Sequence, residues 1–237
     1  MEGDRWIQEA ERLYRRYQLE IVEACGFCPW AERARLNDRF RIRVMLQSDP
    51  HGTDAATLMI DALAVDPRAE VAVLIYPRLR LGRLEFERFV AEVREADAKR
   101  HALGCIPYVF AAFHPEASPD ASDAERLIPF LRRTPDPTIQ LLRSDVLERV
   151  RSATPQGTQF LDMRALESLD AEGREPEISL RQRIARTNLA TVQRLGIGEV
   201  ARRMDAIVLD RKGTYGELRA SVPSSVSSGG AGPAHEP

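Results

Sequence analysis

Apolar side chains recur at helical spacing at the start of the chain. The positions are Trp6, Ala10, Leu13, Tyr17, Ile21 and Cys25. A period of three to four residues is typical of an amphipathic helix, which we expect over residues 4–24. Gly26 and Pro29 mark its end, and residues 30–36 are long enough for one or two further helical turns.

Three later stretches have the pattern of strands, and helical patterns lie between them. Residues 39–46 alternate apolar side chains with arginines, as in a half-buried strand. Residues 71–76 and 106–113 are β-branched and apolar, which is typical of buried strands. Helices are expected over residues 53–64 and 84–101. This β-α-β-α-β order predicts an α/β fold, with a layered sheet of three to four strands, helices packed on it and additional C-terminal helices.

The second half of the chain is predicted to be mainly helical. A short helical stretch follows His114, and a further helix carries Ile139, Leu142, Val146 and Val150. An edge strand is expected at residues 158–163 and a late helix at residues 180–195. We expect a single α/β domain over residues 1–212 and a disordered Ser/Gly/Pro-rich tail over residues 213–237. From Ser221 onward the chain has almost nothing to bury.

Composition limits the classes of partner. The formal net charge of −2 gives no indication of nucleic-acid binding. No apolar run approaches the roughly 20 residues that cross a bilayer, and the N-terminus lacks the features of a secretory signal. We therefore expect a cytoplasmic protein with no nucleic acid and no membrane among its partners. Only two of the 34 Lys and Arg residues are lysines, and we attribute the arginines spread along the chain to genome composition.

The strongest local motif is Cys25-Gly-Phe-Cys28, at the end of the first predicted helix. If a short helix begins near Pro29, its positive end would favour a thiolate at Cys28, making it a candidate nucleophile or metal ligand. A buried, inert Cys28 fits the pattern equally well. A dithiol redox pair with Cys25 is less consistent with it, because the preceding segment is helical rather than a strand. No second cysteine pair has zinc-ligand spacing, so no metal site is predicted.

A second motif, Phe113-His114-Pro115, ends the third predicted strand. Ligands of open α/β sheets bind beyond the carboxyl ends of strands, and a histidine can act as acid or base near neutral pH. His114 is therefore a candidate catalytic residue. It could equally hold a loop through hydrogen bonds to the backbone. The other three histidines, His51, His101 and His235, are interpreted as solvated.

The third motif comprises Arg132-Arg133-Thr134-Pro135-Asp136-Pro137 and the downstream Arg143. Helix amides together with Thr134 and an arginine could form an anion cradle, with Arg133, Thr134 and Arg143 as candidate substrate-binding residues. The alternative is that these arginines are simply solvated. No Gly-rich phosphate loop or serine nucleophile motif is present.

The three motifs, in this order, resemble a bacterial family of unknown function, DUF1415. The matching segments are Phe27-Cys28-Pro29-Trp30-Ala31, Phe113-His114-Pro115, Arg132 to Pro137 with Leu141-Leu142-Arg143, and a late helix at residues 186–195. This chain departs from the family pattern at Arg132 in place of Asn, at Asp136 in place of an aromatic residue, and in the extra Cys25. The resemblance implies a site at these motifs and no particular chemistry.

Two functions from different classes fit the sequence. In the first, an enzyme acts on a small anionic substrate, with Cys28 as nucleophile or thiolate ligand, His114 moving protons, and Arg133 and Arg143 orienting the anion. In the second, a non-catalytic ligand-binding or interaction domain uses the motifs only to shape its loops, each of which contains a proline. A dithiol redox protein is a further alternative. The cofactor and the oligomeric state stay unknown at this point.

Overall fold

A four-stranded mixed sheet forms the centre of the molecule in the computed structural model, which describes residues 2–28, 30–49, 52–101, 104, 106–152 and 180–220. The strands are β1 (Phe40–Val44), β2 (Val71–Ile75), β3 (Tyr108–Phe113) and β4 (Thr138–Arg143), in the spatial order β1-β2-β4-β3. β1 and β2 are parallel, whereas β4 runs antiparallel to both of its neighbours. The α/β prediction is confirmed.

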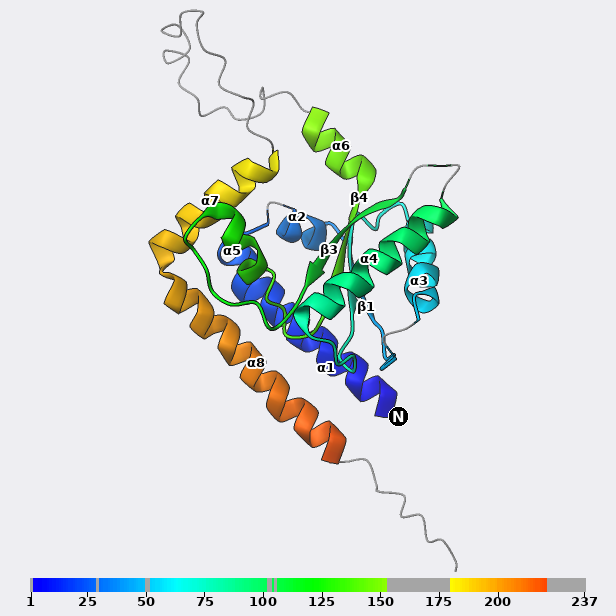
Figure 1. The fold of residues 1–237 in the computed structure, drawn as a ribbon, viewed down its shortest axis with the longest axis horizontal. Helices are drawn as coiled ribbons and strands as arrows, with labels where there is room; N and C mark the ends of the chain where they lie inside the picture. Colours follow the sequence, from blue (N-terminus) through cyan, green and yellow to red (C-terminus); the bar gives the residue numbers. More distant parts are fainter. Residues whose placement is uncertain are drawn as a thin grey trace, which may run out of the picture.

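Helices cover both faces of this sheet (Figure 1). On one face lie α1 (Glu2–Tyr17), the π-helical turn η1 (Gln18–Glu23), α5 (Ala124–Leu131), α7 (Leu180–Leu195) and α8 (Ile197–Ala220). On the other lie α3 (Asp54–Val65) and α4 (Arg83–Arg100). The remaining helices are α2 (Ala31–Leu36) and α6 (Ser144–Ser152). No described helix is long and apolar enough to cross a membrane.

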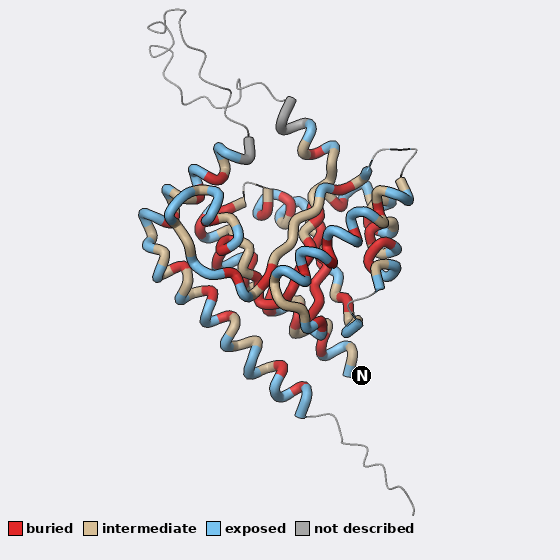
Figure 2. Tube along the Cα trace, in the orientation of Figure 1, coloured by how far each residue is buried: buried red, intermediate tan, exposed pale blue. Residues whose placement is uncertain are grey.

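The alternation of side chains along each strand divides the interior into two cores. Val73 and Ile75 point into the core beneath α1 and α8, whereas Ala72 and Leu74 point into the core beneath α3 and α4. Every residue of β2 is buried, as expected of a strand covered on both faces. In Figure 2 the buried positions concentrate on the strands and on the inner faces of the helices.

The first half of the chain confirms the predicted order of elements. The predicted helix over residues 4–24 is α1 continued by η1, and the turns at residues 30–36 are α2. The expected strands over residues 39–46, 71–76 and 106–113 correspond to β1, β2 and β3. The helices between them are α3 and α4, so α3 is the crossover between the parallel strands β1 and β2.

The predicted helix through Ile139 and Leu142 is wrong. These residues belong to β4, a central strand that pairs with β2 on one side and β3 on the other, and α6 begins only at Ser144. β4 is short and buried, and α6 follows it directly. The apolar positions of the two elements together therefore have the spacing expected of one longer helix. Pairing on both edges satisfies the backbone of residues 138–143, and this long-range term decides the structure.

The C-terminal boundary also differs from the prediction. Gly196 ends α7 as expected, with a positive φ of 84°, but α8 begins at the next residue and continues to Ala220. Tyr215 and Leu218 are buried against α1, so residues 213–220 belong to the folded helix and not to the tail. The expected strand at 158–163 and the expected tail after Ala220 lie outside the described residues.

Candidate functional site

His114 follows β3, and both nitrogens of its ring are engaged. Nε2 lies 3.0 Å from the carbonyl oxygen of Leu81, and Nδ1 accepts the Glu116 amide at 3.3 Å. Since a carbonyl can only accept, Nε2 is the protonated nitrogen of a neutral ring. The ring is buried against Phe86, and this burial lowers the His114 pKa from its ordinary value. The arrangement fixes a loop and leaves no ring nitrogen for proton transfer.

Arg133 and Thr134 lie beside the same turn. The amide of His114 donates to the Arg132 carbonyl, and Arg133 Nε donates to the Pro115 carbonyl at 3.0 Å. The outer end of Arg133 pairs with Asp205 on α8 at 2.8 Å. Thr134 is fully buried and its hydroxyl donates to the Asp136 carbonyl at 2.7 Å. Their interactions join the β3 turn to α8.

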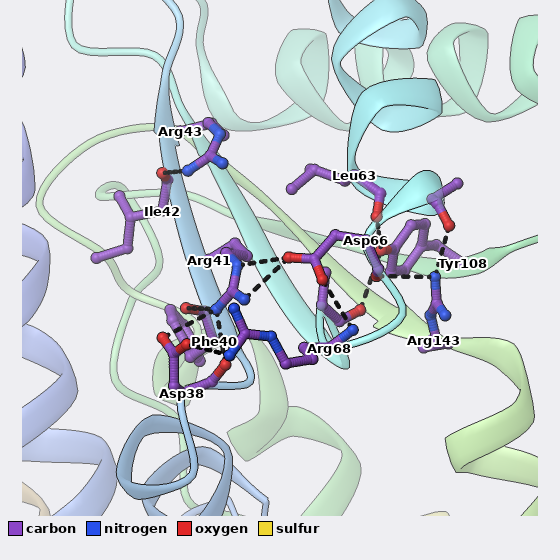
Figure 3. A network of polar contacts seen from close by, with 12 residues as sticks. Asp38, Phe40, Arg41, Ile42, Arg43, Leu63, Asp66, Arg68, Tyr108 and Arg143 are labelled. Carbon is purple, nitrogen blue, oxygen red and sulfur yellow. Dashed lines mark hydrogen bonds and ion pairs between the residues drawn. The ribbon is translucent and has the colours of Figure 1, made fainter.

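Arg143 lies at the other end of the sheet. It pairs with Tyr108 at the start of β3, whereas His114 follows the end of that strand. From Thr138 to Arg143, β4 spans five residue steps, or about 17 Å at roughly 3.3 Å per step. The Arg143 guanidinium donates to the carbonyls of Ala64 and Asp66, at the C-terminal end of α3. Figure 3 shows Arg143 beside Asp66 and Tyr108. Arg143 therefore closes that helix end and is remote from the His114 turn.

Cys28 lies three residues before α2, which begins at Ala31 and not near Pro29. The amides of Trp30 and Ala31 donate toward its sulfur, but burial outweighs this effect and raises the Cys28 pKa. Its neighbours Tyr14 and Tyr17 belong to the core beneath α1. The thiol is therefore the favoured form near neutral pH, on the sheet face opposite to the one that holds the His114 ring. Cys25 also has a raised pKa because of its burial.

The candidate residues thus lie in three separate places, and only one of these holds more than one candidate. His114 comes together with Arg133 and Thr134, whereas Arg143 stands at the opposite end of the sheet and Cys28 on its opposite face. Within the described residues, no contact joins the Cys28 sulfur to the His114 ring. The four-residue site expected from the sequence is not assembled in this structure.

A different cluster occupies the carboxyl ends of the two parallel strands. Residues 77–82 follow β2 and carry Arg78 and Arg80; we refer to this segment as the arginine loop. A cavity of about 370 Å³ lies there, within the size range of small-ligand pockets, and we refer to it as the arginine cavity. Its lining residues are Glu2, Trp6, Ser48, Arg78, Arg80 and Arg219.

Burial alternates along the arginine loop. Pro77 and Leu79 are buried, whereas the residue after each of them, Arg78 and Arg80, is exposed. The guanidinium carbons of Arg78 and Arg219 each lie 5.8 Å from the centroid of the Trp6 ring, within the range of a cation–π contact. The buried Trp6 Nε1 has no hydrogen-bond partner in the described structure. The Trp6 indole is therefore in contact with two guanidinium groups, Arg78 and Arg219, from distant parts of the chain.

The charge of the arginine cavity is only partly compensated. Among the described residues, Arg78, Arg80 and Arg219 form no ion pair, and Glu2 contributes the single carboxylate of the lining. A smaller cavity of about 250 Å³ between α1 and α8 makes the contrast clear. Its Arg12 is bound by Asp210 and Glu9. Arg5 lines this smaller cavity too, but two carboxylates, Glu9 and Glu217, share its lining, whereas the arginine cavity has three arginines and one carboxylate.

The sequence carries a signal for this cluster that lies outside the three motifs. The segment Tyr76-Pro-Arg-Leu-Arg-Leu directly follows the most apolar strand, at the position where α/β sheets bind ligands. From sequence, the same rule favours His114, and the arginines are interpreted as a product of genome composition. Trp6 and Arg219 have no comparable signal, because only the packing of α8 on α1 brings residues so far apart in sequence together.

Comparison with known protein families matches residues 10–177 to a family described as "Protein of unknown function (DUF1415)". This match covers well over half of the chain. The chain belongs to the DUF1415 family. No curated protein and no solved structure shows a significant match.

The DUF1415 match includes the three motifs and part of the arginine cavity. Cys28, His114 and Arg133 lie inside it, as do Arg78 and Arg80. Trp6, Arg219 and the late helix at residues 186–195 lie outside it. The arginine cavity thus combines a loop from the DUF1415 region with the start of α1 and the end of α8, which lie outside that region.

Proposed function

We propose that this DUF1415 protein binds a small anionic ligand, such as a phosphate or carboxylate compound, in the arginine cavity. The observation that carries the proposal is the set of three exposed arginines that line the cavity, two of them over the Trp6 ring, without ion-pair partners among the described residues. Guanidinium groups bind carboxylate and phosphate through paired hydrogen bonds. An anion between them would also relieve the repulsion among three like charges.

The place of the cavity supports the same conclusion. Ser48 follows β1 and Arg78 follows β2, and the carboxyl ends of parallel strands share one edge of a sheet. Ligands of α/β sheets bind at this edge. The start of α1, at Glu2, borders the cavity as well.

His114 supports the site by holding its loop. Its bond to the Leu81 carbonyl fixes the far end of the arginine loop. Glu85 accepts the Gly82 amide at 2.8 Å and Glu116 accepts the Arg83 amide at 3.2 Å, so the start of α4 is fixed too. A loop held at this end orders Arg78 and Arg80 before the ligand arrives, which lowers the entropic cost of binding.

Binding is better supported than catalysis by the sequence candidates. The Cys28 pKa is raised rather than lowered, and both nitrogens of His114 already have partners. A thiol nucleophile needs the opposite shift of pKa, and a proton shuttle needs an accessible nitrogen. These observations favour the ligand-binding hypothesis, with the His-Pro motif in a loop-shaping role.

Tryptophan fluorescence tests the proposal. The chain has two tryptophans, so a Trp30→Phe background leaves Trp6 as the reporter inside the cavity. We expect saturable quenching or enhancement of the Trp6 signal on titration with pyrophosphate or citrate. The double variant Arg78→Gln/Arg80→Gln should weaken binding by about tenfold or more, since a charged hydrogen bond contributes about 1.5–3 kcal/mol.

A matched control uses an arginine outside the cavity. Arg88 is exposed on α4, and Arg88→Gln removes the same charge without touching the lining. We expect its affinity to equal that of the background protein. Equal weakening by Arg88→Gln and by the double variant would show non-specific attraction, and the absence of saturation with either anion would also contradict the proposal.

A further inference from the structure

A second cluster of chemically active side chains lies between α3 and α4, away from the arginine cavity. Asp61 projects from α3, while Asp97 and His101 are one helical turn apart on the last turns of α4 and its C-cap. One ligand-type atom from each residue lies within 4.8 Å of the other two. The two helices lie side by side in Figure 1 and contact each other.

Asp97 is the unusual member of this cluster. Its side chain is fully buried, and neither carboxylate oxygen has a hydrogen-bond partner among the described residues. His101 Nδ1 approaches one of these oxygens to 3.4 Å, but it is closer, at 3.0 Å, to the carbonyl oxygen of Asp97. A buried carboxylate is normally paired, hydrogen-bonded or bound to a cation. The described structure provides Asp97 with no such hydrogen bond.

The neighbours of Asp97 are arranged as metal ligands commonly are. A bond from Nδ1–H to the Asp97 carbonyl fixes the ring of His101 and leaves Nε2 as a lone-pair donor. His101 Nε2 lies 3.8 Å from Asp61 Oδ1. The other oxygen of Asp61 is bound by Arg100, which orients the carboxylate and leaves Oδ1 for another partner.

The spacing suits an ion after a small movement of the side chains. Metal bonds of about 2.1 Å place two ligand atoms up to about 4.2 Å apart, so the 4.8 Å cluster must contract slightly. Asp61 and His101 are only partly buried, so they can move and an ion can enter from solvent. Two carboxylate oxygens and one imidazole suit manganese, iron or zinc, with further positions taken by water.

We propose that Asp61, Asp97 and His101 form a binding site for a divalent transition-metal ion that joins α3 to α4. The sequence carries a signal for it in Asp97-x-x-x-His101, the i, i+4 spacing that places two ligands on one helix face. From sequence alone, His101 is interpreted as solvated and no metal site is predicted. The third ligand, Asp61, comes from a separate helix and is recognisable only in the fold.

Manganese is the sharpest probe, because it prefers oxygen and imidazole ligands and avoids the cysteines of this chain. The full-length protein is treated with a chelator, exchanged into metal-free buffer and titrated with Mn²⁺, and electron paramagnetic resonance counts the free ion. We expect saturable binding of one ion in the wild type. Asp97→Asn and His101→Gln should each weaken it by about tenfold or more.

Glu95→Gln is the matched control, because Glu95 is an exposed carboxylate on the same helix and pairs only with Lys99 among the described residues. Its Mn²⁺ affinity should equal that of the wild type. Should Asp97→Asn fail to fold, the partly exposed His101→Gln still decides the question. A wild type without saturable binding, or variants that bind as tightly as the wild type, would overturn the proposal.

Discussion

His114 Nε2 donates a hydrogen bond to the carbonyl oxygen of Leu81 over 3.0 Å, and this bond joins the end of β3 to the arginine loop. The Phe-His-Pro motif therefore contacts the arginine loop and not the arginine cavity itself. His114 does not line the cavity; it holds one end of the loop that does.

We predict that His114→Gln lowers both stability and ligand affinity. Two hydrogen bonds and the contact with Phe86 are lost or weakened, so the free energy of unfolding should fall by about 1–3 kcal/mol. Pyrophosphate binding should weaken several-fold because the loop is less ordered. Urea denaturation and the Trp6 titration measure the two effects. Glu87→Gln, an exposed change on α4, should alter neither by more than a small amount.

The lowered pKa of His114 also predicts the direction of a pH effect. The unfolded chain has a histidine pKa of about 6.5, and the buried native ring has a lower one. Between these two values the unfolded state binds more protons, so stability is full above about pH 6.5 and declines as pH falls through the native pKa. His114→Gln should flatten this part of the curve. Equal slopes for both proteins in urea denaturation from pH 5 to 7.5 would contradict a buried, neutral ring.

We predict that Cys28 reacts slowly with alkylating reagents. Its raised pKa keeps the thiol protonated near pH 7, and only the thiolate is a nucleophile. In a Cys25→Ser/Cys105→Ser background Cys28 is the sole thiol. Its rate with iodoacetamide at pH 7 should be well below that of free cysteine and should rise to the free value in denaturant. A rate above that of free cysteine would restore the nucleophile hypothesis.

The local sequence pattern predicts the fold correctly for those elements whose structure is set by neighbouring residues along the chain. The alternation at Phe40, Ile42 and Val44 and the apolar run of β2 give β1 and β2 directly, and helical spacing gives α3 and α4. β4 is not predicted from sequence, because residues 138–143 form a strand through pairing with β2 and β3. Ile139 and Leu141 face one core, but the strand is too short for its period to be distinguished from that of the following helix.

The candidate site is less predictable than the fold for a related reason. Sequence correctly places Cys28 before a helix and His114 after a strand, but the sign of a pKa shift depends on burial, which no local pattern reports. The arginine cavity is built from residues 2, 6, 48, 78, 80 and 219. Such a cluster becomes visible only when α8 packs along α1.

Arg143 is predicted to matter for stability and not for binding. Its guanidinium donates to the Ala64 and Asp66 carbonyls and lies over the Tyr108 ring. Arg143→Met leaves those carbonyls without their donor and should lower the free energy of unfolding by about 1–3 kcal/mol. Pyrophosphate affinity should stay unchanged, because the residue is at the opposite end of the sheet from the arginine cavity. Urea denaturation and the Trp6 titration report the two quantities separately.

Arg143→Lys sharpens this prediction. A lysine keeps the charge but lacks the planar guanidinium that lies over the Tyr108 ring while its Nη2 donates to both carbonyls. We expect it to recover only part of the lost stability. If Arg143→Met bound pyrophosphate much more weakly while remaining folded, the substrate-binding role expected from the sequence would be supported instead.

The ion pairs between α1 and α8 predict how the protein responds to acid. Asp210 on α8 accepts two hydrogen bonds of 2.8 Å from Arg12 and a further one from Arg16, and these bonds hold its pKa well below the usual range. A carboxyl with a depressed native pKa contributes stability above the unfolded value of about 3.9 and loses it as pH falls through the native pKa. The docking of α8, and with it the place of Arg219, should therefore weaken at low pH.

Asp210→Asn tests this link. At pH 7 the variant should lose about 1 kcal/mol of unfolding free energy, a modest value because the carboxylate is partly exposed and screened by solvent. Its stability should also fall less steeply than that of the wild type between pH 5 and 3. Glu199→Gln serves as the control, since its bonds to Arg202 and Arg203 stay within α8. Because Arg219 lies near the C-terminal end of the same helix, Asp210→Asn should weaken pyrophosphate binding slightly as well; a larger loss with Glu199→Gln than with Asp210→Asn would contradict the role of the α1–α8 contact.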